Sequence, residues 1–363
     1  MEILILSGKF GNGHWSAACS LRERLEREGH TAQVVDFFAY ALPEWAPAIY
    51  RGFGLLVRYG GGLYNLYHRA TRNGADEVPL AGVLTRRMAE LLAAVRPDAV
   101  IATHPVCAGA AARYKRELGA RLPLITCVTD VTCHSEWIHR GTDCYLAPSA
   151  AVGRGLAAKG VERARIAVTG IPVSGKFGAA GTAAGGEAPG GRRRELLIMG
   201  GGLGLMPRRD GFYQALDSLP GVHTTILTGR NDKLFRRLAG RYANIEAVPF
   251  TDRVDRYMAR ADLMLSKPGG ITVFEAIASR LPILAWEPFL EQERENARFL
   301  LDNGIGLVAA REESACLAAV RACIYHDALL SAMARRMDAM CADLQGNAID
   351  RVVHQVILGE VCA

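Results

Sequence analysis

The sequence predicts an α/β fold built from two similar units, and three observations support this prediction. Short apolar runs alternate with helical patterns, which is typical of parallel sheets with helices on both faces. A strand followed by a glycine-rich turn opens the chain and recurs at 195–204. Between the two occurrences, residues 178–191 read GAAGTAAGGEAPGG, a composition that forms no core and predicts a flexible linker.

The length agrees with this division, because 363 residues are about twice a common domain length. No apolar run reaches the roughly 20 residues that a membrane-spanning helix requires. Glu2 stands where a signal peptide would carry basic residues. We therefore expect a cytosolic protein with an N-terminal domain over 1–177, a linker over 178–192 and a C-terminal domain over 193–345. A C-terminal helix over 346–363 can pack back on the first domain.

Charge and cysteine content narrow the classes of partner. The net charge of +6 suits nucleotide phosphates or an anionic membrane surface. No basic low-complexity run or aromatic-basic motif is present, so nucleic acid is not an expected partner. The nine cysteines never have the CxxC spacing. This spacing argues against a zinc site or a disulfide framework, and we expect reduced thiols and no metal.

The elements of each unit follow from the apolar pattern. The run EILILS at 2–7 predicts a buried strand, and 14–28 predicts a helix whose polar face carries the charged residues. The further strands of the first unit are expected at 32–37, 99–104, 124–130 and 144–149. In the second unit, strands with their following turns are expected at 195–204, 223–229, 245–250, 263–270 and 281–286, and helical residues at 312–345 and 347–358.

The segment 37–69 is dense in aromatic residues and carries scattered arginines. One interpretation is an ordinary core helix with buried tyrosine and phenylalanine. The other is an amphipathic surface that lies in a membrane interface, with rings such as Phe53 and Tyr59 at the acyl boundary and arginines at the headgroups. The pattern alone leaves both open.

The stretch KPGGITVFEA at 267–276 predicts a strand that ends in a glycine turn and runs into a helix. Glycines at 269 and 270 let a ligand approach the backbone, and the helix N-terminus offers unpaired N–H groups to a diphosphate. Glu275 follows one turn later, where a carboxylate can accept hydrogen bonds from two ribose hydroxyls. The alternative is a simple turn with a solvated glutamate.

A second glycine turn, MGGGLGLMP at 199–207, contains Gly201 and Gly202. It lacks the GK[ST] of a Walker loop. It also lacks GxGxxG with an acidic residue at the right distance, so a dinucleotide site is not expected. The turn resembles a phosphate loop only weakly.

The turn GNGHWSAA at 11–18 places His14 at the start of a helix. A helix N-terminus disfavours an imidazolium, so a neutral imidazole is expected there, as a general base requires. A capping or packing histidine is the alternative interpretation.

Two further polar stretches could face a ligand. Residues 129–149 bring Asp130, Trp137 and two histidines together past a strand end, with a spacing that fits no standard zinc pattern. Asp130 could orient an imidazole or contact an acceptor. The cluster Glu291-Gln292-Glu293 is expected in a loop before a helix, where it could bind sugar hydroxyls; a charged helix start is the alternative.

Taken in order, these stretches resemble the glycosyltransferases that build diacylglycerol glycolipids, the monogalactosyldiacylglycerol synthase and processive diacylglycerol β-glucosyltransferase family. More distantly they are similar to the lipid-linked N-acetylglucosaminyltransferase of peptidoglycan synthesis. The resemblance covers nearly the whole chain outside the linker. It rests on the combination GNGHWSAA, TDVTCHSEW, TGIPVSGKF, GGGLG, KPGGITVFEA and EQERENA.

The resemblance implies a GT-B fold, with two Rossmann-like domains whose parallel sheets face a central cleft. The C-terminal domain would bind a UDP-sugar and the N-terminal domain a lipid acceptor, in a peripheral enzyme on the inner face of the cell membrane. The family usually has GQE where this chain has Glu291-Gln292-Glu293, which leaves the identity of the sugar open.

The resemblance also implies roles for individual residues. His14 would act at the acceptor hydroxyl. Beyond the resemblance, our hypothesis is that His14, oriented by Asp130, is the base in an inverting transfer that needs no metal or other cofactor. Glu275 would hold the ribose. The remaining donor-binding residues would be Gly201, Gly202, Gly269 and Gly270 at the diphosphate and Gln292 and Glu293 at the sugar. Acceptor or membrane contacts would come from Trp15, Phe53, Tyr59 and Trp137.

Three other functions stay open at this point. The acceptor could be a polyprenyl lipid, with N-acetylglucosamine or another sugar as the transferred group. A UDP-sugar epimerase would use the same fold without a lipid. A non-catalytic protein that binds nucleotide-sugar or lipid would show binding without turnover.

Overall fold

The computed structural model describes residues 1–10, 13–59, 80–178, 193–201, 204, 206–207, 209–288, 290–345 and 349–359. The chain divides into two compact units. Unit 1 consists of Met1–Ser174, Leu290–Gln292 and Asp343–Ala363, and unit 2 of Gly175–Phe289 and Glu293–Ala342. Apart from Gly178, the expected linker lies outside the described residues, so its flexibility stays a prediction.

Unit 1 is built on a six-stranded sheet in the order β2-β1-β3-β4-β5-β6, with all neighbouring strands parallel. The strand order reverses direction at β1, and in such sheets ligands bind outside the carboxyl ends of the strands near the reversal. The strands are β1 (Glu2–Ser7), β2 (Thr31–Asp36), β3 (Ala99–Ala102), β4 (Leu124–Cys127), β5 (Cys144–Ala147) and β6 (Ile166–Val168).

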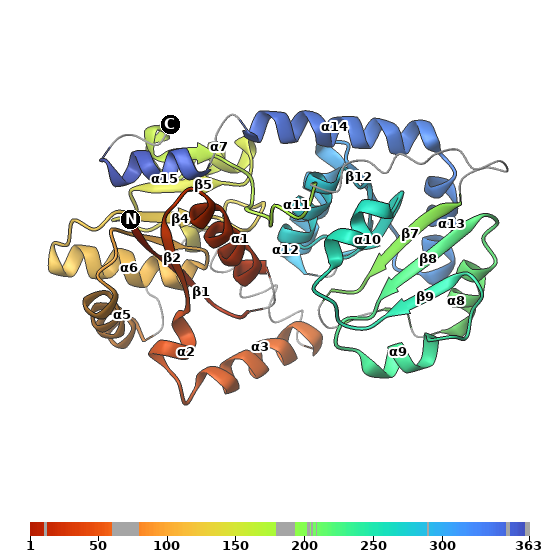
Figure 1. Ribbon diagram of the computed structural model, residues 1–363, viewed down its shortest axis with the longest axis horizontal. Helices are drawn as coiled ribbons and strands as arrows, with labels where there is room; N and C mark the ends of the chain where they lie inside the picture. Colours follow the sequence, from red (N-terminus) through yellow and green to blue (C-terminus); the bar gives the residue numbers. More distant parts are fainter. Residues whose placement is uncertain are drawn as a thin grey trace. The chain divides into compact units, whose positions relative to one another are not determined.

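Helices cover both faces of this sheet because its central strands bury side chains on both sides (Figure 1). On β1, Ile3 packs in one cluster with Leu21 of α1, whereas Leu4 packs in another with Met88 of α5. Successive strand residues point to opposite faces, so an uninterrupted apolar run is what such a strand needs. The helices are α1 (Gly13–Arg27), α2 (Phe37–Ala41), α3 (Ala46–Tyr59), α5 (Ala81–Val95), α6 (Pro105–Leu118) and α7 (Ala150–Ala158), with short 3₁₀ turns η1 (Ser135–Trp137) and η2 (Arg163–Arg165).

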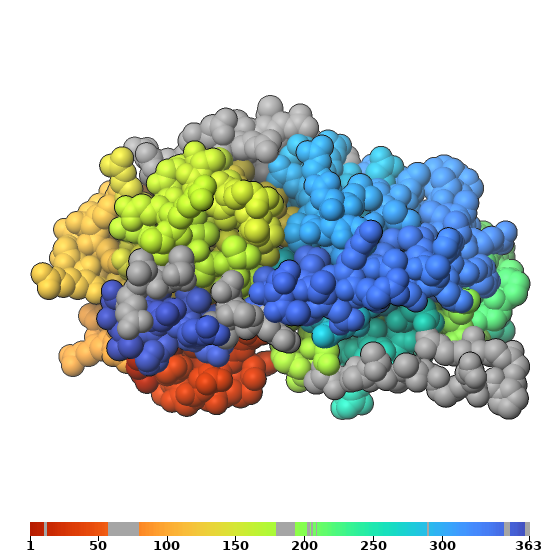
Figure 2. Space-filling model, turned by 90° about the horizontal axis from the view of Figure 1, so that it is seen from above, coloured from red at the N-terminus to blue at the C-terminus, as the bar shows by residue number. Residues whose placement is uncertain are grey.

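The last described helix, α15 (Ile349–Ile357), belongs to unit 1. Its Val353 is fully buried and shares an apolar cluster with Ile3 and Leu21. Helix α15, in blue, lies on the surface beside the red N-terminal segment in Figure 1 and also in Figure 2, which is turned by 90°. The C-terminal helix thus completes the core of the unit in which the chain begins.

Unit 2 repeats the architecture with a parallel six-stranded sheet in the order β12-β11-β10-β7-β8-β9. The two parallel sheets confirm the α/β prediction. The strands are β7 (Arg194–Met199), β8 (Val222–Leu227), β9 (Ile245–Val248), β10 (Leu263–Ser266), β11 (Ile283–Trp286) and β12 (Gly306–Ala309). The helices are α8 (Asp210–Asp217), α9 (Asp232–Leu238), α10 (Val254–Arg260), α11 (Gly270–Ser279), α12 (Glu291–Asp302), α13 (Glu313–Ile324) and α14 (Asp327–Gln345). The first two residues of α12 and the last three of α14 belong to unit 1.

The sequence analysis did not predict the two edge strands β6 and β12. Both are short, and β12 begins at Gly306, a residue type that weakens a strand prediction. The structure explains this glycine, because a Cβ at Gly306 would lie 2.5 Å from the carbonyl oxygen of Ile283 on β11. Close approach to the neighbouring strand therefore outweighs the low strand propensity of glycine.

Candidate active site

In unit 1, the segments that follow β1, β3 and β4 meet at the imidazole of His14. His14 is the second residue of α1, which starts shortly after β1 ends. Thr103 directly follows β3, and its buried hydroxyl lies 2.9 Å from Ser7 Oγ and 3.1 Å from the carbonyl oxygen of His14. Because the carbonyl oxygen can only accept, Thr103 donates to His14 and can accept from the Ser7 hydroxyl. The parallel sheet brings these residues together because the carboxyl ends of its strands lie at one edge.

The hydrogen bonds of His14 define which ring nitrogen carries the proton. His14 Nδ1 lies 2.6 Å from Thr129 Oγ1 and 3.0 Å from the carbonyl oxygen of Thr103. Because a carbonyl oxygen can only accept, Nδ1 is the protonated nitrogen in the neutral ring. The Thr129 hydroxyl in turn donates to the same Thr103 oxygen at 3.4 Å. Within the described residues Nε2 has no hydrogen-bond partner, so its lone pair is available to accept a proton.

A second histidine, His104, packs beside His14 with ring centroids 4.8 Å apart. Its Nδ1 accepts a hydrogen bond from the backbone N–H of Val106 at 3.2 Å, at the start of α6. Burial, together with the nearby His14, holds the pKa of His104 well below its usual value. His104 is therefore a neutral neighbour that places no positive charge beside the His14 ring.

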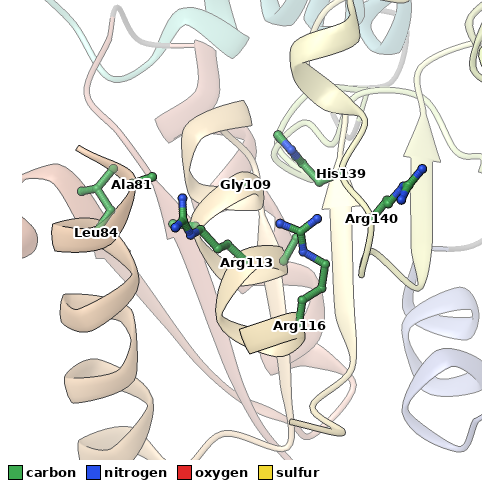
Figure 3. A pocket seen from close by; sticks show the side chains of 9 residues that line it. Ala81, Leu84, Gly109, Arg113, Arg116, His139 and Arg140 are labelled. Atoms are coloured by element: carbon green, nitrogen blue, oxygen red, sulfur yellow. The ribbon is translucent and has the colours of Figure 1, made fainter. Parts of the chain in front are cut away.

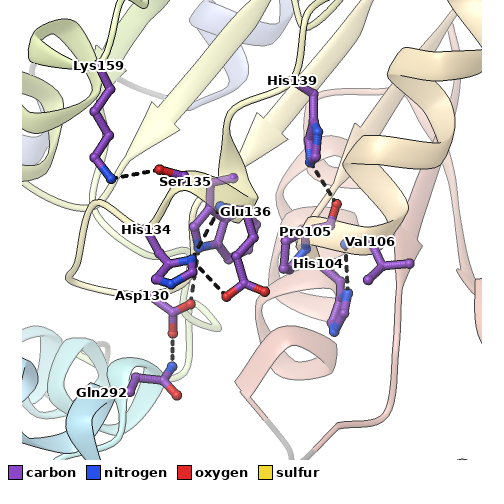
Figure 4. A network of polar contacts seen from close by, with 11 residues as sticks. His104, Pro105, Val106, Asp130, His134, Ser135, Glu136, His139, Lys159 and Gln292 are labelled. Atoms are coloured by element: carbon purple, nitrogen blue, oxygen red, sulfur yellow. Dashed lines mark hydrogen bonds and ion pairs between the residues drawn. The ribbon is translucent and has the colours of Figure 1, made fainter. Parts of the chain in front are cut away.

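Asp130 does not orient His14, contrary to the expectation from the sequence. Its carboxylate accepts from Trp137 Nε1 at 3.2 Å. It also accepts from the side-chain amide of Gln292, as Figure 4 shows. The partner of His14 is the preceding residue, Thr129. Asp130 instead fixes Trp137, which stays free of contact with solvent.

Trp137 is only 1% exposed and packs with Val128 and Tyr145 in a buried cluster. A ring this deeply buried cannot insert into a membrane, so the predicted membrane contact of Trp137 is wrong.

The two histidines near Trp137 in the sequence, His134 and His139, have partners of their own. His134 Nδ1 lies 2.9 Å from Glu136 Oε1, and His139 Nε2 lies 3.2 Å from the carbonyl oxygen of Pro105 (Figure 4). Across the described part of the chain, no three His, Cys, Asp or Glu side chains gather where they could hold a metal ion.

In unit 2, the turn between β10 and α11 presents a bare helix N-terminus. Gly269 is the N-cap of α11 and offers no side chain, and none of the other described residues caps this end. The first-turn amides are therefore available to an anion. The turn is held from α12, because Asn296 Nδ2 donates to the carbonyl oxygen of Pro268 at 2.7 Å and Lys267 Nζ lies 3.4 Å from Glu293 Oε1. Gly269 and Gly270 form this helix start, and their contact with a diphosphate stays a prediction.

Glu275 lies in the middle of α11, where it is partly buried. This burial raises its pKa from the ordinary value of 4.5 to about 8. None of the other described residues donates a hydrogen bond to it or pairs with it. A desolvated carboxyl group without a donor can accept hydroxyl donors from a ligand.

The turn after β7 contains Gly201 and Gly204, both with positive φ, at +69° and +56°. A Cβ at Gly204 would lie 2.0 Å from the carbonyl oxygen of Thr228, so this position requires glycine. Asn231 Nδ2 donates to the Gly204 carbonyl oxygen at 2.9 Å and fixes the turn against α9. The other predicted residue, Gly202, lies outside the described residues.

Gln292 and Glu293 occupy the first turn of helix α12 rather than a loop, so the loop prediction for Glu291-Gln292-Glu293 is wrong. Acidic residues are favoured in a first helical turn by the helix dipole, which was the alternative interpretation. Glu293 is engaged with Lys267. The cluster is therefore a rigid helix start.

The described part of the aromatic segment forms α2, α3 and the turn between them, and its apolar residues divide between core and surface. Phe37 and Phe38 are buried in the core. By contrast, Trp45 is 66% and Leu55 is 59% exposed. Among the predicted contact residues, Phe53 is partly buried against Phe10, with centroids 5.2 Å apart. Trp15 is partly buried under Lys9 Nζ, which lies 4.7 Å from its ring. The side chain of Tyr59 lies outside the described part.

The sequence analysis missed three polar residues that shape these sites: Thr103, Thr129 and Asn296. Asn296 is 1% exposed, and its Oδ1 has no hydrogen-bond partner in the part of the chain that the structure describes. A buried asparagine within an otherwise charged helix start was the available signal. Nothing local distinguishes the two threonines, because their contacts with His14 span 89 and 115 positions.

Known proteins match both parts of the chain. Residues 14–173 match the model of the monogalactosyldiacylglycerol (MGDG) synthase family, and residues 211–341 match that of the glycosyltransferase family 28 C-terminal domain. A processive diacylglycerol beta-glucosyltransferase from Bacillus thuringiensis (strain Al Hakam) is 27% identical over 359 residues, which is 93% of this chain and 89% of the relative.

Solved structures share the fold at low identity. CalG4, the calicheamicin glycosyltransferase, has a TM-score of 0.63 at 16% identity and covers 99% of both chains. The UDP-GlcNAc 2-epimerase from Neisseria meningitidis bound to UDP-GlcNAc has a TM-score of 0.55 at 14% identity, over 95% of this chain and all of the other. These likenesses, with the two parallel sheets, confirm the GT-B fold.

Among the described residues, no individual helix has both the length and the apolar composition that crossing a membrane requires. One sharply bent pair, Glu313–Ile324 with Asp327–Ile357, satisfies the length and composition criteria.

Proposed function

Because the chain belongs to the diacylglycerol glycosyltransferase family, we propose that it is an inverting enzyme that moves a hexose from a UDP-sugar to the primary hydroxyl of diacylglycerol. The observation that carries this proposal is the His14 ring. Its Nδ1–H is held by Thr129 and Thr103, while Nε2 has no partner among the described residues. A ring held in this tautomer can act as a general base, because its unprotonated Nε2 can accept a proton.

The acceptor step follows from this geometry. His14 Nε2 takes the proton of the lipid hydroxyl as the hydroxyl oxygen attacks the anomeric carbon. The bond from this carbon to the diphosphate breaks, its electron pair leaves with UDP, and the sugar acquires the β configuration. The imidazolium that forms is stabilised by Thr129 Oγ1 and the Thr103 carbonyl oxygen, which both accept from Nδ1–H.

On the donor side, we assign the diphosphate to the first turn of α11, with Gly201 and Gly202 as further contacts. Negative charge grows on the leaving diphosphate, and preorganised N–H donors of this kind typically lower a barrier by about 3–4 kcal/mol each. Glu275 would accept hydrogen bonds from the ribose hydroxyls. Gln292 and Glu293 are proposed to contact the sugar. We expect no metal ion or other cofactor to be required.

We further propose that α3 and the turn before it attach the enzyme to the inner face of the cell membrane. Trp45, just before α3, and Leu55, on α3, are exposed apolar residues, and Arg51 on the same helix is also exposed. Exposed apolar and basic side chains together favour binding to an anionic lipid interface. Flotation with anionic vesicles should fall for Trp45→Ser/Leu55→Ser. Unchanged flotation would refute this attachment site.

One experiment tests the proposed reaction against its alternatives. The protein is incubated with a panel of UDP-sugars, with and without diacylglycerol liposomes, and the products are identified by mass spectrometry and NMR. A β-glycosyl diacylglycerol that forms only with liposomes supports the proposal. Glycosylation of a polyprenyl acceptor alone, epimerisation of the UDP-sugar without lipid, or binding without turnover would each replace it with the corresponding alternative.

A further inference from the structure

A pocket of about 160 Å³ lies in unit 1 between α5, α6 and the turn at 139–142. It shares no residue with the His14 hydrogen-bond network. Its floor is apolar and small, formed by Leu84 and by residues of α6, while basic side chains line its walls (Figure 3). The wall residues are Arg113, Arg116, His139 and Arg140.

The basic residues of this pocket are not fully neutralised by the protein. Arg113 is paired with Glu117, at 2.6 Å from Nε to Oε1. Arg116 and Arg140 are exposed, and neither has an ion pair or hydrogen bond with any described residue. Figure 3 shows the Arg116 guanidinium reaching toward the His139 ring and that of Arg113 turned toward Ala81 and Leu84. The pocket therefore combines a small cavity with a surplus of positive charge.

The walls of the pocket are held in place by contacts that need particular residues. Gly141 has φ +109°, and a Cβ there would lie 3.1 Å from the carbonyl oxygen of Ala112 on α6. Tyr145 Oη accepts from the His139 N–H at 3.1 Å and donates to the His139 carbonyl oxygen at 3.2 Å. His139 Nε2 contacts the carbonyl oxygen of Pro105 at 3.2 Å. The turn that carries His139 and Arg140 is thus fixed against α6.

We propose that this pocket binds a phosphate group, either of a soluble phosphate compound or of a phospholipid headgroup. The planar guanidinium presents paired N–H donors that match phosphate oxygens. A cavity of this volume has room for one such group. The site is additional to the proposed donor and acceptor sites and does not depend on the proposed reaction.

Two double variants of equal charge change provide the test. Arg116→Ala/Arg140→Ala removes the two unpaired cations, and Arg154→Ala/Arg163→Ala removes two other exposed arginines of unit 1 that do not line the pocket. The first probe is inorganic phosphate, titrated calorimetrically in chloride buffer. The pocket variant should bind phosphate about tenfold or more weakly than the control variant.

The second probe distinguishes the source of the phosphate. Flotation is compared on phosphatidylcholine vesicles with and without phosphatidylglycerol. A selective loss with inorganic phosphate supports a soluble ligand, and a selective loss only with the phosphatidylglycerol vesicles supports a headgroup. If the two double variants behave alike with both probes, the proposal is overturned.

A folding control keeps the test decisive. Circular dichroism and thermal unfolding of both double variants are measured first. If the alanine pocket variant does not fold, Arg116→Lys/Arg140→Lys replaces it, because lysine keeps the charge but loses the paired donors. The lysine variant should bind phosphate more weakly than the Arg154→Ala/Arg163→Ala control. Equal binding of phosphate by these two variants would count against the proposal.

Discussion

His14 Nδ1 lies 2.6 Å from Thr129 Oγ1, across 115 positions of the chain. Together with the Thr103 carbonyl oxygen, this contact fixes the ring so that Nε2 keeps its lone pair. A general base is useful only in this tautomer, because the nitrogen that faces the substrate has to be unprotonated. The proposed catalytic power of His14 thus depends on a neutral threonine rather than on a carboxylate.

Removing the base should affect turnover rather than donor binding. We expect His14→Ala to lower kcat by roughly 10²–10⁴ while UDP affinity stays the same. Steady-state kinetics and calorimetry with UDP measure the two quantities. His30→Ala, a partly buried histidine outside the proposed site, is the matched control. Wild-type turnover in the His14 variant would show that another group takes the proton.

Thr129→Val removes the hydroxyl with little change in shape. The Thr103 carbonyl oxygen remains as an acceptor, so the expected loss is one hydrogen bond, or about tenfold in kcat. Thr126→Val removes another buried hydroxyl of the same segment, one that bonds to Thr142 instead, and should leave kcat near the wild-type value. Equal kcat values in the two variants would contradict the positioning role of Thr129.

The raised pKa of Glu275 makes the stability of the unliganded protein depend on pH. Between about pH 4.5 and pH 8 the unfolded carboxyl group is ionised while the folded one keeps its proton. Stability should therefore fall as the pH rises through this window, by an amount on the order of a few kcal/mol. Glu275→Gln should remove most of this decline. Urea unfolding at several pH values measures it, and parallel curves for wild type and variant would refute the assignment.

The same carboxyl group should link UDP binding to pH. Ribose hydroxyls donate to the ionised form, so UDP affinity should rise with pH up to about 8 and binding below this pH should release a proton. Glu275→Ala should weaken UDP binding and abolish this pH dependence, whereas Glu246→Ala on the exposed side of β9 should do neither. Calorimetry in buffers of different ionisation heat tests the proton release. Unchanged UDP affinity in the Glu275 variant would argue against ribose contact.

Two glycine-to-alanine variants in unit 2 should differ in their effect on stability. At Gly204 a Cβ would lie 2.0 Å from the Thr228 carbonyl oxygen and φ is +56°, so alanine should lower the melting temperature by several degrees or more. At Gly211, inside α8, a Cβ would meet nothing within 4 Å. Alanine there should be neutral or stabilising by up to about 1 kcal/mol. Thermal unfolding of both variants gives the answer, and equal melting temperatures would disprove the strain.

The sequence was sufficient to find the residues whose chemistry depends on local pattern. Gly269 and Gly270 after an apolar strand predict the start of a helix, and α11 begins there with a glycine N-cap that offers no side chain. His14 was found in the same way, at the start of α1. The prediction for Asp130 failed because two neighbouring polar residues, Thr129 and Asp130, compete for one role. Only the contacts show that the neutral residue meets the ring and the charged residue meets Trp137.

The sequence by itself determined the parallel α/β class, the glycine turns and the family resemblance, because apolar periodicity and turn chemistry act over a few residues. Tertiary structure alone decided that Trp137 is buried, that Glu275 is desolvated and that α15 completes the core of unit 1. These properties depend on contacts between residues far apart in the chain. The burial and the pKa of a side chain depend on the groups that surround it in space. The local sequence pattern does not specify these groups, because they come from distant parts of the chain.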